Sequence, residues 1–104
     1  MIEIATLHVG GVIAIGFDSS GRYAIVVSHS GRGVYDTQTW LRVARDNQLA
    51  YPDDGIAEGI GPLSGQQIKV IEEYYGGTLI AVSPNKEFEM HYLEGTIEVF
   101  STIH

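Results

Sequence analysis

The chain has 104 residues, enough for a single domain over 1–104 with a modest core, and it carries a net charge of −7. It has no cysteine, which excludes a disulfide scaffold, a thiolate nucleophile and a cysteine zinc site. The first residues lack the basic start and apolar run of a signal peptide, and no window is apolar enough for a membrane span, so we expect a cytoplasmic protein.

The negative charge is unevenly distributed along the chain. Residues 1–52 are neutral, whereas residues 53–104 contain nine acidic residues and two lysines. An acidic protein repels phosphate backbones, so we expect no nucleic-acid partner. It attracts basic proteins and steers them on approach.

In the first half, short apolar segments alternate with turns. "VGGVIAIGF" (9–17) is apolar and β-branched, and "YAIVVSH" (23–29) is a continuous apolar run that predicts a strand covered on both faces. "DSSGR" (18–22) and "SGRG" (30–33) are turns, and "GVYD" is a further strand that ends at the corner "TQT".

Residues 37–47 fit either a helix or a strand. Trp40, Leu41 and Ala44 would share one face of a helix, whereas Leu41 and Val43 alternate with Arg42 as in a strand. We favour the strand because other strands precede it. Residues 46–65 contain two prolines and four glycines, so we expect a connection between the halves with at most one short helical turn.

The second half repeats the pattern of strands and turns. It predicts strands at 66–73, 78–83, 87–93 and 96–102. Alternation in "EFEMHYL" directs Phe88, Met90 and Tyr92 inward and Glu87, Glu89 and His91 outward.

Turn signals recur about every 8 to 12 residues, a spacing typical of sandwiches and barrels. We therefore predict an all-β fold, or a mainly β fold with one short helix. Two consecutive antiparallel β-meanders would pack through their apolar faces as a sandwich or an open barrel.

The stretch "SHSGRGVYD" (28–36) contains residue types that catalysis uses. A serine hydrolase would need a serine, His29 and Asp36 in contact, but neighbouring strand residues point to opposite faces and the Gly-x-Ser-x-Gly elbow is missing. A hairpin turn explains the stretch better: Gly31 and Gly33 would supply unusual backbone angles, and Asp36 would cap the next corner.

No cofactor or metal site is expected. The four histidines are scattered without metal-ligand spacing, although His91 beside Glu89 would suit a weak cation site. The glycines of residues 55–65 lack the strand, helix and Gly-Lys context of a phosphate loop.

Acidic and aromatic residues of the second half predict a partner-binding face. Carboxylates pair with the lysines and arginines of a partner, and tyrosine is a common interface anchor. The candidate residues are Glu72, Glu73, Tyr74, Tyr75, Glu87, Glu89, His91, Glu94 and Glu98, with Tyr92 nearby. The alternative is a solvated face that keeps the protein soluble.

Two motifs resemble a group of small bacterial proteins. These are "GRGVYD" with a following "ARD" (31–46) and "GIGPLSG" (59–65), which together cover about half of the chain. The group is often encoded beside secreted antibacterial toxins and is similar to immunity proteins, whereas the hairpin at "PNKEF" departs from it. The resemblance implies a toxin-neutralising protein rather than an enzyme.

We therefore expect an immunity or antitoxin protein that blocks a basic nuclease toxin through its acidic face. A basic nuclease holds phosphates, so an acidic surface is a sensible antagonist. The alternatives are a small hydrolase that uses His29 or His91, and a self-associating module that uses edge strands and the outward Phe100.

Overall fold

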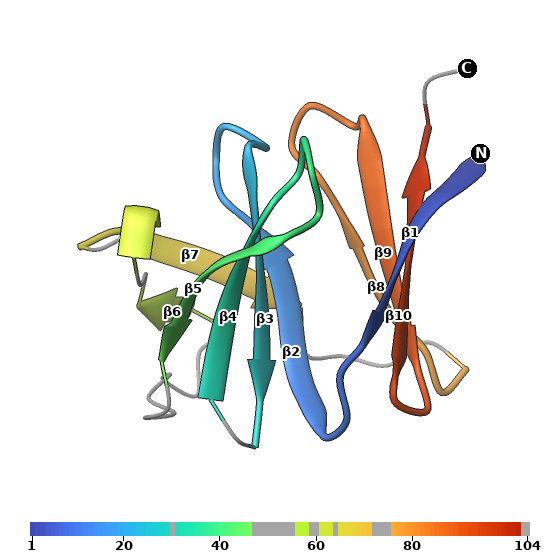
Figure 1. Cartoon of the computed structure of the whole chain (residues 1–104), viewed down its shortest axis with the longest axis horizontal. Helices are drawn as coiled ribbons and strands as arrows, with labels where there is room; N and C mark the ends of the chain where they lie inside the picture. Colours follow the sequence, from blue (N-terminus) through green and yellow to red (C-terminus); the bar gives the residue numbers. More distant parts are fainter. Residues whose placement is uncertain (30, 47–55, 59–60, 64, 72–75, 103–104) are drawn as a thin grey trace.

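The computed structural model describes residues 1–29, 31–46, 56–58, 61–63, 65–71 and 76–102 (Figure 1). The described strands are β1 (Ile2–His8), β2 (Val12–Phe17), β3 (Tyr23–Ser28), β4 (Gly31–Asp36), β5 (Arg42–Asp46), β6 (Ile56–Glu58), β7 (Gln67–Ile71), β8 (Leu79–Val82), β9 (Phe88–Leu93) and β10 (Thr96–Ser101). A single turn of 3-10 helix, η1 (Gly61–Leu63), accompanies them. The all-β prediction is confirmed.

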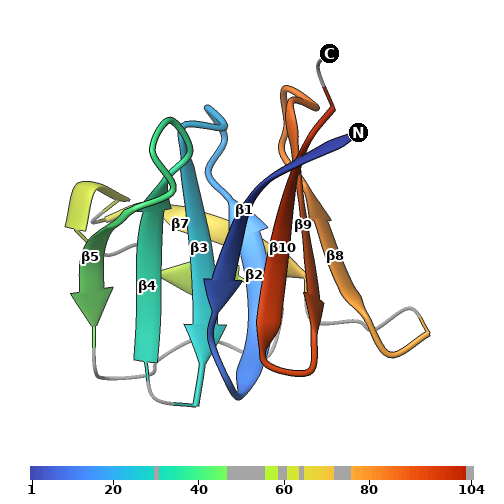
Figure 2. The ribbon, with the colours of Figure 1, turned by 45° about the vertical axis from the view of Figure 1, so that its right-hand side comes forward.

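The strands form two antiparallel sheets that pack against each other. One sheet has the order β1-β10-β9-β8 and the other has the order β5-β4-β3-β2-β7-β6. The two predicted meanders are present as β2 to β5 and β8 to β10. Each sheet also includes a strand from the other half of the chain: β1 pairs with β10, and β7 pairs with β2 (Figures 1 and 2).

The main core lies between the two sheets. Its buried residues are Val12, Ile15, Phe17, Ala24, Val26, Trp40, Leu79, Ala81, Met90, Tyr92, Ile97 and Val99. Alternation explains this set, because every second residue of β9 and β10 points inward. Burial of this apolar surface is the main favourable contribution to folding.

A second core covers the opposite face of the six-stranded sheet. It contains Ala14, Ile25, Val27, Val34, Leu63, Ile68 and Val70. Successive residues of β3 therefore enter different cores, which confirms the prediction that this apolar run is covered on both faces. β7 pairs with β2 through its last residues, and in Figures 1 and 2 the strand passes behind β3 and β4. The 3-10 turn η1, which precedes β7, contacts β5.

The corner after β4 leads into a strand, β5, as predicted, and no helix is present in the described part of residues 37–47. Asp36 caps the corner: its carboxylate accepts a hydrogen bond from the Gln38 backbone N–H at 2.8 Å, and its carbonyl accepts one from Trp40 at 2.6 Å. Trp40 adopts a left-handed φ of 56° and buries its ring between Phe17 and Phe88.

In the described part of 28–36, β3 and β4 pair as the two strands of the predicted hairpin. Ser28 pairs with Gly31, and the Ser28 hydroxyl donates to the Gly31 carbonyl at 3.1 Å. Gly31 has a φ of 140°, which residues with a side chain rarely adopt. The same role predicted for Gly33 is wrong, because Gly33 does not have a positive φ. No helix in the described part of the chain has the length and apolarity needed to cross a bilayer.

Candidate functional site

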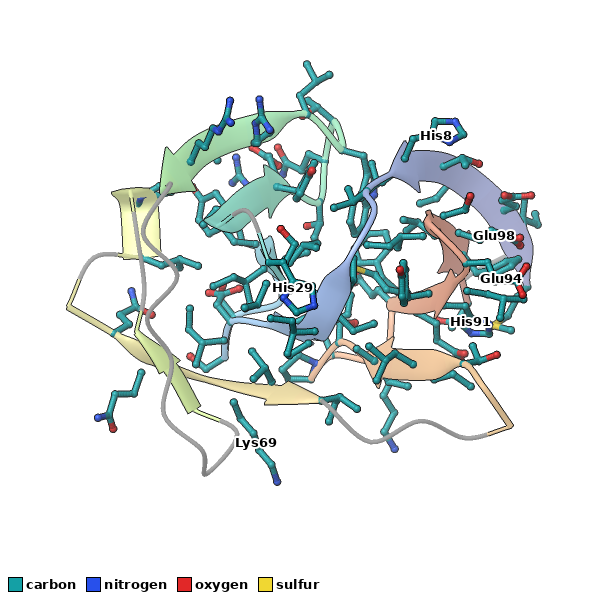
Figure 3. The ribbon with its side chains drawn as sticks, turned by 90° about the horizontal axis from the view of Figure 1, so that it is seen from below. His8, His29, Lys69, His91, Glu94 and Glu98 are labelled. Carbon is teal, nitrogen blue, oxygen red and sulfur yellow. The ribbon has the colours of Figure 1, made fainter. Side chains whose placement is uncertain are left out.

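The outward side of the four-stranded sheet gathers acidic and apolar residues. Strand pairing aligns Glu3, Phe100, Glu89 and Val82 in one row, and Thr6, Glu98, His91 and Ile80 in the next. Because paired residues share a face, these eight residues form one surface, which we call the acidic face. Figure 3 shows His91 and Glu98 of this face on one side of the molecule.

Side-chain contacts order the middle of the acidic face. The His91 Nε2 atom lies 2.9 Å from the Glu89 carboxylate, and the His91 ring lies 4.8 Å from the Phe100 ring between centroids. At the edge, the Thr6 hydroxyl donates to the Glu3 carboxylate at 3.0 Å. These contacts hold the Glu89 and His91 side chains in a fixed position on the acidic face.

Charge is separated between the two sheets. The four strands that carry the acidic face contain three glutamates and two histidines, with neither lysine nor arginine. The four arginines belong to the other sheet and its turns: Arg32 to β4, Arg42 and Arg45 to β5, and Arg22 to the turn before β3. The acidic face therefore presents a local negative potential that no neighbouring cationic residue on its own strands offsets.

Apolar side chains are exposed beside these charges. Val82 on the face and Leu93 at the end of β9 each have half of their surface exposed. Phe100 is only partly buried although it is a large aromatic residue. An apolar centre with charged neighbours is the usual composition of a protein interface.

The predicted site residues fall into four groups. Glu89, His91 and Glu98 lie on the acidic face, in agreement with the prediction that their side chains point outward. Glu94 lies in the turn between β9 and β10, beside that face in Figure 3. Glu87 lies just before β9 and lines a separate shallow cleft with Arg22 and Thr37. Glu72, Glu73, Tyr74 and Tyr75 lie outside the described residues.

Two features of the face differ from the sequence-based picture. Tyr92 is not available as an anchor, because its side chain is buried in the core. Glu3 and Thr6 were missed, since the pairing of β1 with β10 joins residues that are far apart in the sequence. The outward position of Phe100, predicted by alternation, now gains a contact with His91.

In the described part of 28–36, the side chains of Ser28 and Asp36 have partners other than His29. The Ser28 hydroxyl donates to a backbone carbonyl, and Asp36 accepts two hydrogen bonds from the Arg22 guanidinium at 3.2 and 3.0 Å. His29 is exposed, and its backbone N–H donates to Gly11. The Ser28 hydroxyl and the Asp36 carboxylate are thus both bonded to groups other than the His29 ring.

The His91 and Glu89 side chains, which the sequence suggested for a weak cation site, lie 2.9 Å apart. Among the residues that the structure describes, no group of three or more histidines and carboxylates lies close enough to hold a metal ion. A protein metal site normally needs three or four such ligands.

Comparison of the chain with known proteins found no matching family model, no similar curated protein and no similar solved structure.

Proposed function

We propose that this protein is a binding inhibitor that docks a basic protein partner through its acidic face. The observation that carries the proposal is the placement of Glu3, Glu89 and Glu98 around Phe100 on strands without lysine or arginine. Opposite charges accelerate encounter, and the exposed aromatic ring supplies apolar contact after docking.

The partner class that fits this surface is a toxin domain that acts on nucleic acid. Such a domain needs positive charge to hold phosphates, and carboxylates on a rigid sheet occupy the same cationic residues. The resemblance of residues 31–46 and 59–65 to immunity-type proteins supports the same class. An immunity protein neutralises its toxin by binding and requires no catalytic group of its own.

The decisive experiment measures complex formation with the product of the adjacent gene. The acidic-face variant is the triple substitution Glu3→Gln, Glu89→Gln and Glu98→Gln, which removes three negative charges with little change in shape. Its matched control is Gln38→Lys, Gln66→Lys and Gln67→Lys, at exposed positions outside the face, which changes the net charge by the same amount.

Calorimetric titration should show that the acidic-face variant binds at least about tenfold more weakly at low salt, and the control should bind like the wild type. In co-expression, the wild type and the control should rescue growth. Equal affinities of the two triple variants, or equal losses in both, would contradict docking through this face.

Self-association is a second candidate, favoured by the exposed side chains of the edge strand β1. Ile2 and Ile4 are 55% and 45% exposed, and one side of β1 has no paired strand among the described residues. An unpaired edge is a template for pairing with another chain. Light scattering at increasing concentration tests this candidate, and a monomer at every concentration would eliminate it.

A further inference from the structure

A cleft of about 270 Å³ lies on the six-stranded sheet, on the side that faces the other sheet. Arg42 and Arg45 of β5, Tyr35 and Gly33 of β4, and His8 at the end of β1 line it. Ser28 and Gly31 line it as well, so part of the stretch that contains catalytic residue types lies at a cavity.

A β-bulge places both arginines on the cleft side of β5. Arg42 and Arg45 are three positions apart, and regular alternation would direct them to opposite faces. The register shifts between Val34 and Tyr35, so that Tyr35 pairs with Arg42 and Gly33 pairs with Arg45. Tyr35 and Gly33 share a face, and the arginines therefore share it too. Bulges commonly redirect side chains at binding sites.

Gly33 keeps the floor of the cleft open. It lies in the middle of a strand without a positive φ, so its backbone does not require glycine. A Cβ atom at this position would lie 3.3 Å from the Tyr35 ring and 3.4 Å from the Arg42 Cδ atom. Glycine inside a strand often marks a place where a ligand or another backbone approaches closely.

The lining is cationic although the protein is strongly acidic. Among the residues whose side chains the structure describes, no aspartate or glutamate lines the cleft and no carboxylate forms an ion pair with Arg42 or Arg45. Arg22 differs from these two arginines, because its guanidinium forms an ion pair with the Asp36 carboxylate at 3.0 Å. Charges are screened over roughly 8 Å at physiological salt, so the groups lining the cleft determine what it attracts more than the net charge does.

We propose that this cleft binds a small oxyanion, a phosphate or carboxylate group carried by a compact ligand. The planar guanidinium groups of Arg42 and Arg45 suit paired hydrogen bonds to two oxygens of such a group. The Tyr35 hydroxyl and the His8 ring supply further hydrogen-bonding groups along the lining. The volume is below that of typical drug-sized pockets, which restricts the ligand to a small anion. The site is separate from the acidic face, so it does not depend on the proposed docking function.

The test titrates the full chain with inorganic phosphate and, separately, with succinate, and follows the backbone amide signals by NMR. The cleft variant is Arg42→Gln with Arg45→Gln. The matched control is Lys69→Gln with Lys86→Gln, which removes the same charge elsewhere; Lys69 lies across the molecule from His8 in Figure 3. A third variant, Gly33→Ala, narrows the floor without changing charge.

We expect one of the two anions to saturate the wild type and the control with a dissociation constant near or below about 1 mM, shifting the Gly31 and Gly33 amides. The anion that binds more tightly identifies the group, phosphate or carboxylate. The double arginine variant should weaken binding at least about tenfold, and Gly33→Ala should weaken it as well.

The proposal is overturned if neither anion saturates the wild type, or if the control loses as much affinity as the arginine variant. Melting temperatures confirm that each variant is folded. Should the double arginine variant be unfolded, full retention of affinity in Gly33→Ala would overturn the proposal by itself.

Discussion

Glu98 of β10 lies directly between Thr6 of β1 and His91 of β9, so residues from both ends of the chain meet in one row. Glu3 reaches the same surface through the neighbouring pair with Phe100. The acidic face therefore exists because the first and last described strands pair. Its contribution to binding and its contribution to folding can be separated by substitution.

Phe100 and Val99 are adjacent residues with opposite orientations. Substituting each of them in turn separates an effect on partner binding from an effect on stability. Val99 is fully buried, whereas Phe100 points outward. Val99→Ala should lower the free energy of unfolding by about 2 kcal/mol, since it removes buried methyl groups and leaves a cavity. Phe100→Ala should cost less than about 1 kcal/mol in stability but weaken partner binding at least about tenfold. Urea denaturation and calorimetric titration measure the two effects. A stability loss of equal size in both variants would contradict the orientation of Phe100.

Gly16 lies where β2 meets β7. A Cβ atom there would lie 2.6 Å from the Lys69 backbone oxygen, so one strand has to move. Gly16→Ala should therefore destabilise the protein by about 1–3 kcal/mol, the usual cost of overpacking. Gly10→Ala is the control, because no described residue beyond its two chain neighbours lies within 4 Å of the point that its Cβ atom would occupy. Thermal unfolding compares the two, and equal melting temperatures would mean that β2 and β7 are not in close contact.

Asp36 links the corner after β4 to Arg22. The Arg22 guanidinium, and secondly the Gln38 backbone N–H, lower the pKa of the Asp36 carboxyl below its ordinary value. A carboxyl with a lowered pKa in the folded state stabilises the fold above its unfolded pKa of about 3.9, and this contribution is lost as the pH falls through the folded pKa. The melting temperature of Asp36→Asn should therefore fall below that of the wild type at neutral pH and converge with it in acid.

The control for this pH dependence is Glu98→Gln, an exposed carboxyl on the acidic face. Its melting temperature should follow that of the wild type at both pH values. A constant difference between Asp36→Asn and the wild type down to strongly acidic pH would show that the carboxylate charge is not the stabilising feature.

Trp40 combines a buried ring with a left-handed backbone. Its ring makes edge contacts with Phe17 and Phe88, at 6.5 and 5.7 Å between centroids, so Trp40→Ala should lower the unfolding free energy by about 3–5 kcal/mol. Because the φ of 56° disfavours any residue with a Cβ atom by about 1–2 kcal/mol, Trp40→Gly should be more stable than Trp40→Ala. Circular dichroism during urea unfolding ranks the two variants. The reverse order would contradict this backbone conformation.

Local features of the fold were predictable because they depend on neighbouring residues. The unbroken apolar run of β3 predicted coverage on both faces, and the alternation around Met90 predicted which residues of β9 point outward. Asp36 followed by Thr37 and Gln38 predicted a capped corner. In each case the residue types restrict backbone angles and side-chain direction over a few positions.

The sequence by itself therefore determined the all-β class, the two meanders, the inward and outward faces of their strands, and the concentration of acidic residues in the second half. Only the tertiary structure decided which distant strands pair, since β1 with β10 and β2 with β7 depend on how the whole apolar surface is buried. The tertiary structure also determined which side chains line the cleft, because a single extra residue in β5 turns Arg42 and Arg45 to the same side. No local sequence pattern predicts where such a bulge will form.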